Sequence, residues 1–562
     1  MLTSKIKMLM KENPEGIFSR TERLPFSILR AKKNKKTNGG QKMTTLKKQE
    51  FEIKVLQNRN GKGFYFTDPY FYTLALLGVD GPFTQQQLLD IYKIYGDMAT
   101  DKSWSKKVVK MSDLKFVSQK NINIRKRDGM QFNFVEITEN GMDFLKETGF
   151  VNKAAKIRNN STGDHTIGIR QVLVDVLNVI AENKELGGKY VTQNTIFPIS
   201  KYDTTEKPLN VYRFYQDEKL GVNDNIRFFN KTKEEIVSAK ANFVTSLNSY
   251  ATSNFKDIGL FPDWVFQFKK NLFHVEVDSG KQSFEKKSET ADVVGEAKQT
   301  TIKQKVEKYF EIAEKLPNHK HHAVFVLLDD SVTTKKYFGN RTTRIRNLKD
   351  GIGELLIKDA PANLKVSVIS LERAKDFFST YFLSVLETEK EDLKRLNAAI
   401  NFMNRSSMYP YDMKIIKKDN MKDWDVEVNK DIMKTPFLIS SFYKNLKLKE
   451  EQKKLSLVHH NIVPIMVKEG DVLTYAKINH YSKMFREQVF KKTKLLLIYD
   501  TKKNMEQDVL HTVPKRNKLE NLIYQKVLLM PFDEWEKSNH NFYGIDQKAI
   551  SASDLLDFLD KE

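Results

Sequence analysis

The sequence predicts a multidomain protein of the mixed α/β (α+β) class. Its 562 residues suffice for about three or four domains of ordinary size. Hydrophobic residues make up 40% of the chain and include 37 Phe and 21 Tyr, enough to form several cores. Short alternating apolar runs, typical of strands, occur between amphipathic stretches with helical spacing. Together these observations favour sheets covered by helices.

Composition and charge divide the chain into five expected parts. A basic arm spans residues 1–49, where thirteen of the first fifty residues are Lys or Arg and four are Glu. A small domain at 50–150 is followed by a polar linker at 151–164. A central α/β domain occupies 165–370, and a C-terminal α/β domain occupies 371–562. Met43 is an alternative start, in which case the arm is an extension of the true chain.

The overall charge points to a polyanionic partner. The formal net charge is +22, from 94 basic and 72 acidic residues, which favours nucleic acid first and an anionic membrane surface second. A genome rich in A and T, which over-uses Lys and Asn, would explain part of this excess. The absence of cysteine excludes disulfides, thiolate catalysis and Cys-type zinc sites. With no signal peptide and no apolar run of about 18 residues, we expect a cytoplasmic protein.

The domain at 50–150 shows the order of elements of a winged helix-turn-helix. Helices are expected over 67–76, 83–92 and 102–111, and the second has Thr84 as its cap. Two alternating runs within 121–138 surround Asp128-Gly129, which predicts a hairpin.

Basic residues of this domain stand where a winged helix contacts duplex DNA. The third helix would enter the major groove, and the hairpin would contact the phosphate backbone. The predicted DNA-binding residues are Lys106, Lys107, Lys110, Arg125, Lys126 and Arg127. The same pattern also fits a winged helix that contacts protein, or a solvated basic face.

Three carboxylates mark the middle of the chain. Asp263 follows Pro262 at the start of one expected strand, and Glu276 and Asp278 lie in the next strand on the same face as His274. Carboxylates gathered at one end of a sheet repel each other unless a cation joins them. Hard oxygen ligands favour Mg²⁺ or Mn²⁺, so Asp263, Glu276 and Asp278 are the predicted metal ligands.

The helix expected after these strands carries Lys305 and Tyr309, four residues apart. A lysine there is placed to stabilise charge on a phosphodiester in its transition state, while a bound ion would activate the attacking water. The predicted catalytic residues are Asp263, Glu276, Asp278, Lys305 and Tyr309. The alternative is a structural sheet edge whose acids pair with Lys269, Lys270 and Lys281.

These motifs, in this order, resemble the replication-relaxation family of plasmids and other mobile elements in Gram-positive bacteria. The matching positions are Pro262, Asp263, Glu276-Val277-Asp278, Lys305, Tyr309, Arg341, Arg344 and Arg346, within residues 50–370. The resemblance implies a winged helix followed by a PD-(D/E)XK nuclease-like domain. It also implies double-stranded DNA as partner, a role in plasmid replication or in relaxase-like nicking during conjugation, and protein partners in those processes.

One departure leaves two functions open. Asp278 stands where the nuclease motif has lysine, so either Lys305 supplies that charge from the next helix or the site is inactive. Lys305 and Tyr309 also stand where some nuclease branches place a Gln-x-x-x-Tyr pair that touches DNA. The first expectation is a Mg²⁺- or Mn²⁺-dependent endonuclease or nickase, and the alternative is a non-catalytic regulator of replication or copy number. A basic scaffold at a membrane or secretion apparatus is a third, weaker interpretation.

Other segments carry structural expectations. Helices are expected from His165, over 234–247 and over 371–403, and His319-Lys320-His321-His322 is interpreted as a solvated loop. The order strand 461–466, helix 472–490 and strand 495–499 repeats the central pattern, including a Lys477/Tyr481 pair. This predicts a degenerate second nuclease-like copy without chemistry, although any α/β domain gives a similar pattern. A short amphipathic helix is expected near the C-terminus.

Overall fold

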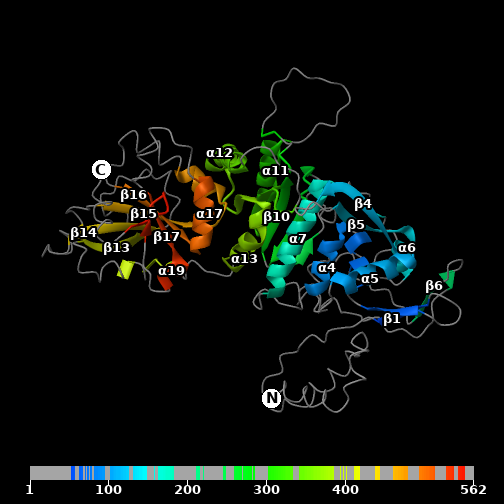
Figure 1. Cartoon of the computed structure of the whole chain (residues 1–562). Coiled ribbons are helices and arrows are strands. Elements are labelled where there is room, and N and C mark those ends of the chain that lie inside the picture. The colour runs from blue at the N-terminus through cyan, green and yellow to red at the C-terminus, as the bar shows by residue number, and fades with distance from the viewer. Residues whose placement is uncertain are drawn as a thin grey trace, which may run out of the picture. The chain divides into compact units, whose positions relative to one another are not determined.

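The protein is described here by a computed structural model of the whole chain. The structure describes residues 52–56, 63–67, 70, 73–74, 76–78, 81–94, 101–125, 131–147, 157, 163–182, 211–214, 219–220, 245–247, 258–268, 270–280, 283–284, 301–332, 341–384, 393, 396–397, 400–401, 411–417, 437–443, 460–478, 493–512, 527–536 and 542–550. The basic arm, the Asp128-Gly129 turn and the C-terminal helix of the sequence analysis lie outside these residues. The described part mixes helices with four sheets, which confirms the α/β class (Figure 1).

The first of these sheets is small and has the strand order β2-β1-β6-β7. Its strands are β1 (Glu52–Leu56), β2 (Gly63–Thr67), β6 (Val211–Phe214) and β7 (Lys219–Leu220). Strand β2 ends at Thr67, the residue at which the first helix was expected to begin, and the described residues between 70 and 78 are helical.

A three-stranded sheet with helices on it forms from residues 83–147. Its order is β3-β5-β4, and all pairings are antiparallel. The elements are β3 (Phe83–Thr84), α4 (Gln85–Ile94), α5 (Asp101–Asp113), β4 (Val117–Arg125), β5 (Gln131–Ile137) and α6 (Glu139–Glu147). Thr84 caps α4 by accepting from the Gln87 amide at 3.2 Å, as predicted. Trp104 ties α5 to α4 by donating to the Gln85 carbonyl at 3.1 Å.

The central sheet has five strands in the order β12-β11-β10-β9-β8. They are β8 (Thr245–Leu247), β9 (Trp264–Phe268), β10 (Asn271–Asp278), β11 (Lys320–Leu327) and β12 (Leu364–Ser370). The pairs β8–β9 and β9–β10 are antiparallel, whereas β10–β11 and β11–β12 are parallel. Its helices are α7 (Asp164–Glu182), α11 (Ile302–Lys315), α12 (Arg341–Asp359) and α13 (Ala374–Ser384), with the 3₁₀ turn η5 at Leu371–Arg373.

Strand β10 is buried along its whole length because helices cover both faces of the sheet. Phe273, Val275 and Val277 share a core with residues of α7 and α13. The core around α11 and α12 lies on the opposite face and holds Val306, Tyr309 and Leu348. Residues at alternate positions of β10, including Glu276, therefore face α11.

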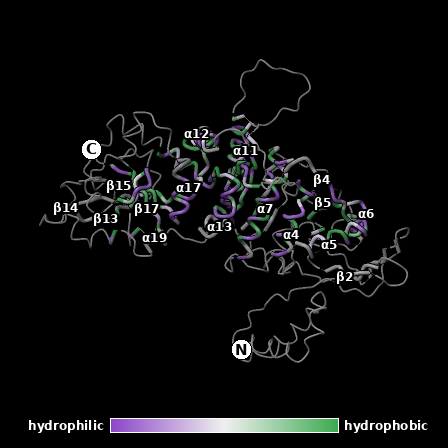
Figure 2. The backbone as a smooth tube through the Cα atoms, in the orientation of Figure 1, coloured by the Kyte–Doolittle hydropathy of each residue, from purple (hydrophilic) through white to green (hydrophobic). Residues whose placement is uncertain are grey.

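The C-terminal sheet has the order β13-β14-β15-β16-β17-β18-β19. Its strands are β13 (Tyr411–Lys417), β14 (Phe437–Tyr443), β15 (His460–Val467), β16 (Thr493–Tyr499), β17 (Val527–Pro531), β18 (Phe542–Tyr543) and β19 (Ala549–Ile550). Helices α17 (Lys502–Thr512) and α19 (Phe532–Glu536) follow β16 and β17. The predicted β-α-β order holds here, because β15 and β16 are parallel and residues 472–478 between them are helical. Buried apolar residues occupy Leu495–Ile498 of β16 and Val527–Met530 of β17, and the hydropathy around β17 can be followed in Figure 2.

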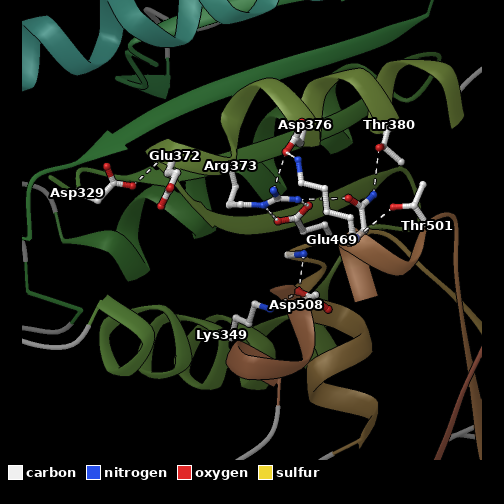
Figure 3. Close-up of polar contacts among 12 residues, drawn as sticks. Asp329, Lys349, Glu372, Arg373, Asp376, Thr380, Glu469, Thr501 and Asp508 are labelled. Atoms are coloured by element: carbon white, nitrogen blue, oxygen red, sulfur yellow. Dashed lines mark hydrogen bonds and ion pairs between the residues drawn. The ribbon is translucent and has the colours of Figure 1, made fainter. Parts of the chain in front are cut away.

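Polar contacts join the central and C-terminal sheets (Figure 3). Arg373, just after β12, donates to both carboxylate oxygens of Glu469, just after β15, at 2.8 and 2.9 Å. Lys349 of α12 lies 3.1 Å from Asp508 of α17, and both side chains are buried. The Val368 amide of β12 donates to the Gly470 carbonyl at 3.0 Å. These sheets therefore meet through buried charge pairs in addition to apolar packing.

Three expectations are corrected by the structure. The helix expected over 234–247 is wrong at its end, because Thr245–Leu247 pairs with β9 as strand β8. The helix expected from 371 begins at Ala374, after the 3₁₀ turn. His321 and His322 are not in a solvated loop: both are buried in β11. No described helix has the length and apolarity that a membrane crossing requires.

Candidate active site

The β9–β10 hairpin brings Asp263 beside the end of β10. Trp264 lies opposite Val275 in the antiparallel register. Asp263, which precedes Trp264, therefore lies beside the residues that follow Val275 on β10. The Asp263 Oδ2 atom accepts a hydrogen bond from the Val277 amide at 2.8 Å. This contact lies between Glu276 and Asp278, which places all three predicted acids at one end of the sheet.

Glu276 is held by two residues of α11. Lys305 Nζ lies 2.6 Å from one carboxylate oxygen, and the Tyr309 hydroxyl donates to the other at 2.7 Å. Lys305 and Tyr309 are four residues apart and so share one face of the helix. Thr301 and Gln304 form a capping box that fixes the start of α11. The glutamate side chain is 2% exposed and the lysine side chain 18%, so the pair opens to solvent only on the lysine side.

Burial and charge set the protonation of this pair. Burial raises the pKa of Glu276 above its usual value, and the positive charge of Lys305 opposes that rise. Burial alone would lower the pKa of Lys305, but the charge and hydrogen bond of Glu276, with the charges of Asp263 and Asp278, raise it overall. Burial beside Glu276 raises the pKa of Tyr309 far above its usual range. Lys305 is therefore a cation, and Tyr309 a neutral hydrogen-bond donor, at neutral pH.

Asp278 has a different partner. Arg344 of α12 donates to Asp278 Oδ2 from Nε at 3.1 Å and from Nη2 at 2.9 Å. The Gly280 amide donates to Oδ1 at 2.8 Å. Gly280 has φ of 80°, a conformation that glycine adopts without strain, and the tight turn after β10 depends on it. Arg344 is one of the three arginines on which the family resemblance rests.

His165 joins the site from α7, and the sequence analysis did not single it out as a site residue. Its Nε2 atom donates to the Val277 carbonyl at 2.8 Å and lies 3.5 Å from Asp263 Oδ2. Burial lowers the pKa of His165, but the hydrogen bond and charge of Asp263 and the Val277 carbonyl outweigh it, so the pKa is raised. The only signal in the sequence was its place at the first turn of a helix after a polar linker.

Each predicted acid thus has its own basic partner in the chain, and the partner of Asp263 is a histidine that is a cation only when protonated. Asp263 faces His165, Glu276 faces Lys305, and Asp278 faces Arg344. These partners come from α7, α11 and α12. Of the three lysines of the alternative, Lys269 and Lys281 lie outside the described residues. Over the described residues, no three His, Asp or Glu side chains gather as a metal-binding group. The donor chemistry of Asp263 and Glu276 suits Mg²⁺ or Mn²⁺, whereas Asp278 is engaged by Arg344.

Buried histidines extend from this site along the sheet. His274 Nε2 is hydrogen-bonded to His321 Nδ1 at 3.1 Å, and the His274 ring packs 5.2 Å from that of Tyr309. Burial lowers the pKa of His274 and of His321. His322 instead accepts from the Tyr381 hydroxyl at 2.8 Å. His274 and His321 fill the core on the face of Glu276, whereas His322 stacks on Phe273 on the opposite face. The interactions of all three rings are structural.

The structure describes four of the six predicted DNA-binding residues. Lys106 and Lys110 are exposed on α5. Lys107 is half-buried, with its ammonium 5.6 Å from the centre of the Tyr70 ring, so it packs along the domain surface. Arg125 ends β4, and Lys126 and Arg127 lie outside the described residues.

No family model, curated protein or solved structure matches the chain.

Proposed function

We propose that this protein binds double-stranded DNA and cleaves one of its phosphodiester bonds as a Mg²⁺- or Mn²⁺-dependent endonuclease or nickase. The observation that carries the catalytic part is the contact of Lys305 and Tyr309 with Glu276, beside Asp263, at the end of β10. A buried carboxylate, a second acid and a partly exposed lysine are what cleavage of a phosphodiester requires in a metal-dependent nuclease.

DNA binding is supported by the domain at 83–147. Strand β3, helices α4 and α5 and the β4–β5 hairpin follow the order of a winged helix, and the sheet order β3-β5-β4 is the one that this fold requires. In that interpretation α5 is the recognition helix, with Lys106 and Lys110 exposed on it. The net charge of +22 adds long-range attraction to a polyanion.

The chain's residues have distinct parts in the proposed reaction. Asp263 and Glu276 would hold the divalent ion, which when bound polarises the phosphate and lowers the pKa of water. Lys305, cationic and partly exposed, stabilises the negative charge that develops on the phosphate oxygens. Tyr309 orients Glu276 through its hydroxyl. Arg344 neutralises Asp278 and so keeps a third acid from repelling the phosphate.

A second function rests on a separate observation. Because Lys305 and Arg344 each pair with one acid and His165 lies beside the third, the chain itself already supplies a basic partner to every acid of the site. A protein whose site acids already have basic partners needs no metal ion in order to fold. This property is expected of a non-catalytic DNA-binding regulator of replication or copy number. In either case the resemblance of the motifs to the replication-relaxation family suggests a plasmid or other mobile element as the setting, with replication or transfer proteins as partners.

Incubation with supercoiled plasmid separates these functions. Purified protein is mixed with plasmid in Mn²⁺, in Mg²⁺ and in EDTA, and nicked and linear products are measured over time. We expect products only with a divalent ion, and a loss of at least about 100-fold in Glu276→Gln and Asp263→Asn. The matched control is Glu314→Gln, which removes an exposed charge from the same α11.

Two results would count against catalysis. One is the absence of any product with either ion while DNA binding persists, which would leave the regulator. The other is equal cleavage by wild type, Glu276→Gln and Glu314→Gln, which would place the chemistry at another site or in a contaminant.

A further inference from the structure

Helix α5 exposes an apolar side chain between two lysines. Trp104, Val108 and Met111 are buried beneath the helix. The opposite face carries Lys106, Val109 and Lys110. Val109 is 50% exposed, and in the described part of the chain only Phe261 and Ile357 are large apolar residues of similar exposure.

A lone exposed apolar residue needs no explanation by itself. The position of Val109 is what distinguishes it. Lys106 is three residues from Val109 and four from Lys110, so all three belong to the outer face of α5. Valine is also a weaker helix former than most polar residues that could stand on a surface. A stiff branched side chain between two cations suits a surface that meets phosphates at its sides and an apolar group at its centre.

The major groove of DNA offers that combination. Phosphates line both edges of the groove, and the 5-methyl group of thymine is the apolar group on its floor. Asp113, an exposed acid at the last residue of α5, would repel phosphates there. Lys106, Val109 and Lys110 lie in the middle of this 13-residue helix, ahead of Asp113, and this middle part is therefore the part that suits the groove.

We propose that Val109 is a specificity-determining residue that contacts the methyl group of a thymine in the major groove, while Lys106 and Lys110 contact flanking phosphates. This inference rests on the proposed DNA-binding function. It adds that the binding site contains a thymine at a fixed position, read through its methyl group. Burial of one methyl group is expected to change affinity about fourfold.

The experiment uses the full chain and a library of duplex DNA with a randomised centre. Sequences retained by the wild-type protein are selected, and a single selected duplex is then made with thymine and, separately, with uracil at every thymine position. Uracil pairs identically but lacks the methyl group. We expect the wild type to bind the uracil duplex about fourfold or more weakly, with dissociation constants measured at one fixed salt concentration.

Three variants test whether Val109 is responsible. Val109→Ala should bind the thymine duplex as weakly as the wild type binds the uracil duplex, and should not distinguish the two. Val109→Thr keeps one methyl group and should keep part of the difference. Ile357→Ala, which shortens an exposed aliphatic side chain on α12, should behave as the wild type. Circular dichroism and gel filtration accompany each variant.

The outcomes separate this inference from the function on which it rests. If the wild type retains no duplex even at low salt, the proposed DNA binding fails. If it binds the thymine and uracil duplexes equally, or if Val109→Ala keeps the full difference, DNA binding stands and the thymine contact is wrong. A change in oligomeric state with Val109→Ala, with no change in the thymine-to-uracil ratio, would show that Val109 contacts protein.

Discussion

The central and C-terminal sheets share one arrangement of strands and differ in the residues at the ends of β10 and β15. In each, two antiparallel steps lead to an eight-residue strand, β10 or β15, and two parallel steps follow. Helices α12 and α17 make the last crossover in their respective sheets. A glycine of positive φ follows both eight-residue strands, Gly280 at 80° and Gly470 at 78°. The same backbone plan is thus used twice in one chain.

The ends of the two strands carry acids in opposite settings. Glu276 and Asp263 lie beside Lys305, and the Asp263 side chain remains 19% exposed. Glu469 is clamped by Arg373 through both oxygens, and the two side chains are 5% and 10% exposed. One strand end keeps a side open to solvent, and the other is closed against the neighbouring sheet. Glu276 lies within β10, whereas Glu469 follows the last residue of β15 by two positions. Both strand ends thus hold a buried acid, and the partner of that acid decides whether the end stays open to solvent or closes against a neighbouring sheet.

The largest effect on stability is expected at the end of β15, where Arg373 pairs with Glu469. Arg373→Ala would leave Glu469 buried and charged without its partner, which costs about 3–5 kcal/mol. Urea unfolding should show this loss of stability, with a separate early transition for the C-terminal sheet. Lys375→Ala removes a nearby pair with Glu182 in which both side chains are largely exposed, and should cost less than about 1 kcal/mol. Equal costs for the two variants would contradict the closed-end interpretation.

Replacing Lys305, beside the end of β10, and Lys468, just after β15, should affect DNA cleavage differently. If the proposed reaction holds, Lys305→Met is expected to lower the rate of plasmid nicking about 100-fold or more, because it removes the cation that would lie next to the phosphate. Lys468→Met breaks the pair with Asp500, 2.7 Å away in the C-terminal sheet, and should leave the rate within about twofold. Initial rates in Mn²⁺ measure both. If Lys468→Met were as damaging as Lys305→Met, the second strand end would be part of the site.

The Lys349–Asp508 pair offers a smaller test. Asp508 also accepts from the Gly470 amide at 2.7 Å and the Tyr499 hydroxyl at 3.1 Å, so two donors remain when the lysine is lost. Lys349→Met should therefore cost about 2 kcal/mol, less than Arg373→Ala. Adding Asp508→Asn should recover part of that cost by removing the unpaired charge. An additive loss in the double variant would show that the pair does not act as a unit.

The smallest effect concerns Asp175 on α7. This acid is mostly buried and, unlike Asp278 and Glu469, its carboxylate is not paired with an arginine. Burial raises the pKa of Asp175 to about 7, and the hydrogen bond from Gln171 opposes this. The folded state therefore holds a proton that the unfolded state releases near pH 4, so stability should fall as pH rises from about 4 to 7. Asp175→Asn should remove roughly 2 kcal/mol of that dependence, discounted for partial exposure. Thermal unfolding at pH 5 and pH 8 measures it, and an unchanged difference would refute the assignment.

Local elements were predictable from the sequence, whereas contacts between distant residues were not. The hairpin of β4 and β5, the strand of Glu276 and the helix of Lys305 follow from periodicity within a few residues. His165 contacts a residue 112 positions away, and Arg373 one 96 positions away, and no local pattern indicates such pairs. His321 and His322 were misjudged because polarity predicts exposure, while their burial depends on α11 and on Tyr381. The strand β8 was missed because its pairing with β9 outweighs a helical sequence pattern.

The contact of Gly470 and Asp471 with β12 determines which fragments of the chain can be produced separately. Strand β12 ends the order of the central sheet, and the residues beside it are Gly470, through its carbonyl, and Asp471, through a bridge to Ser367. Unpaired edges of this kind join other chains. A fragment that stops before residue 411 would present the outer side of β12 to its neighbours. Such a fragment is expected to aggregate even with the candidate site intact, so the two sheets need to be produced together.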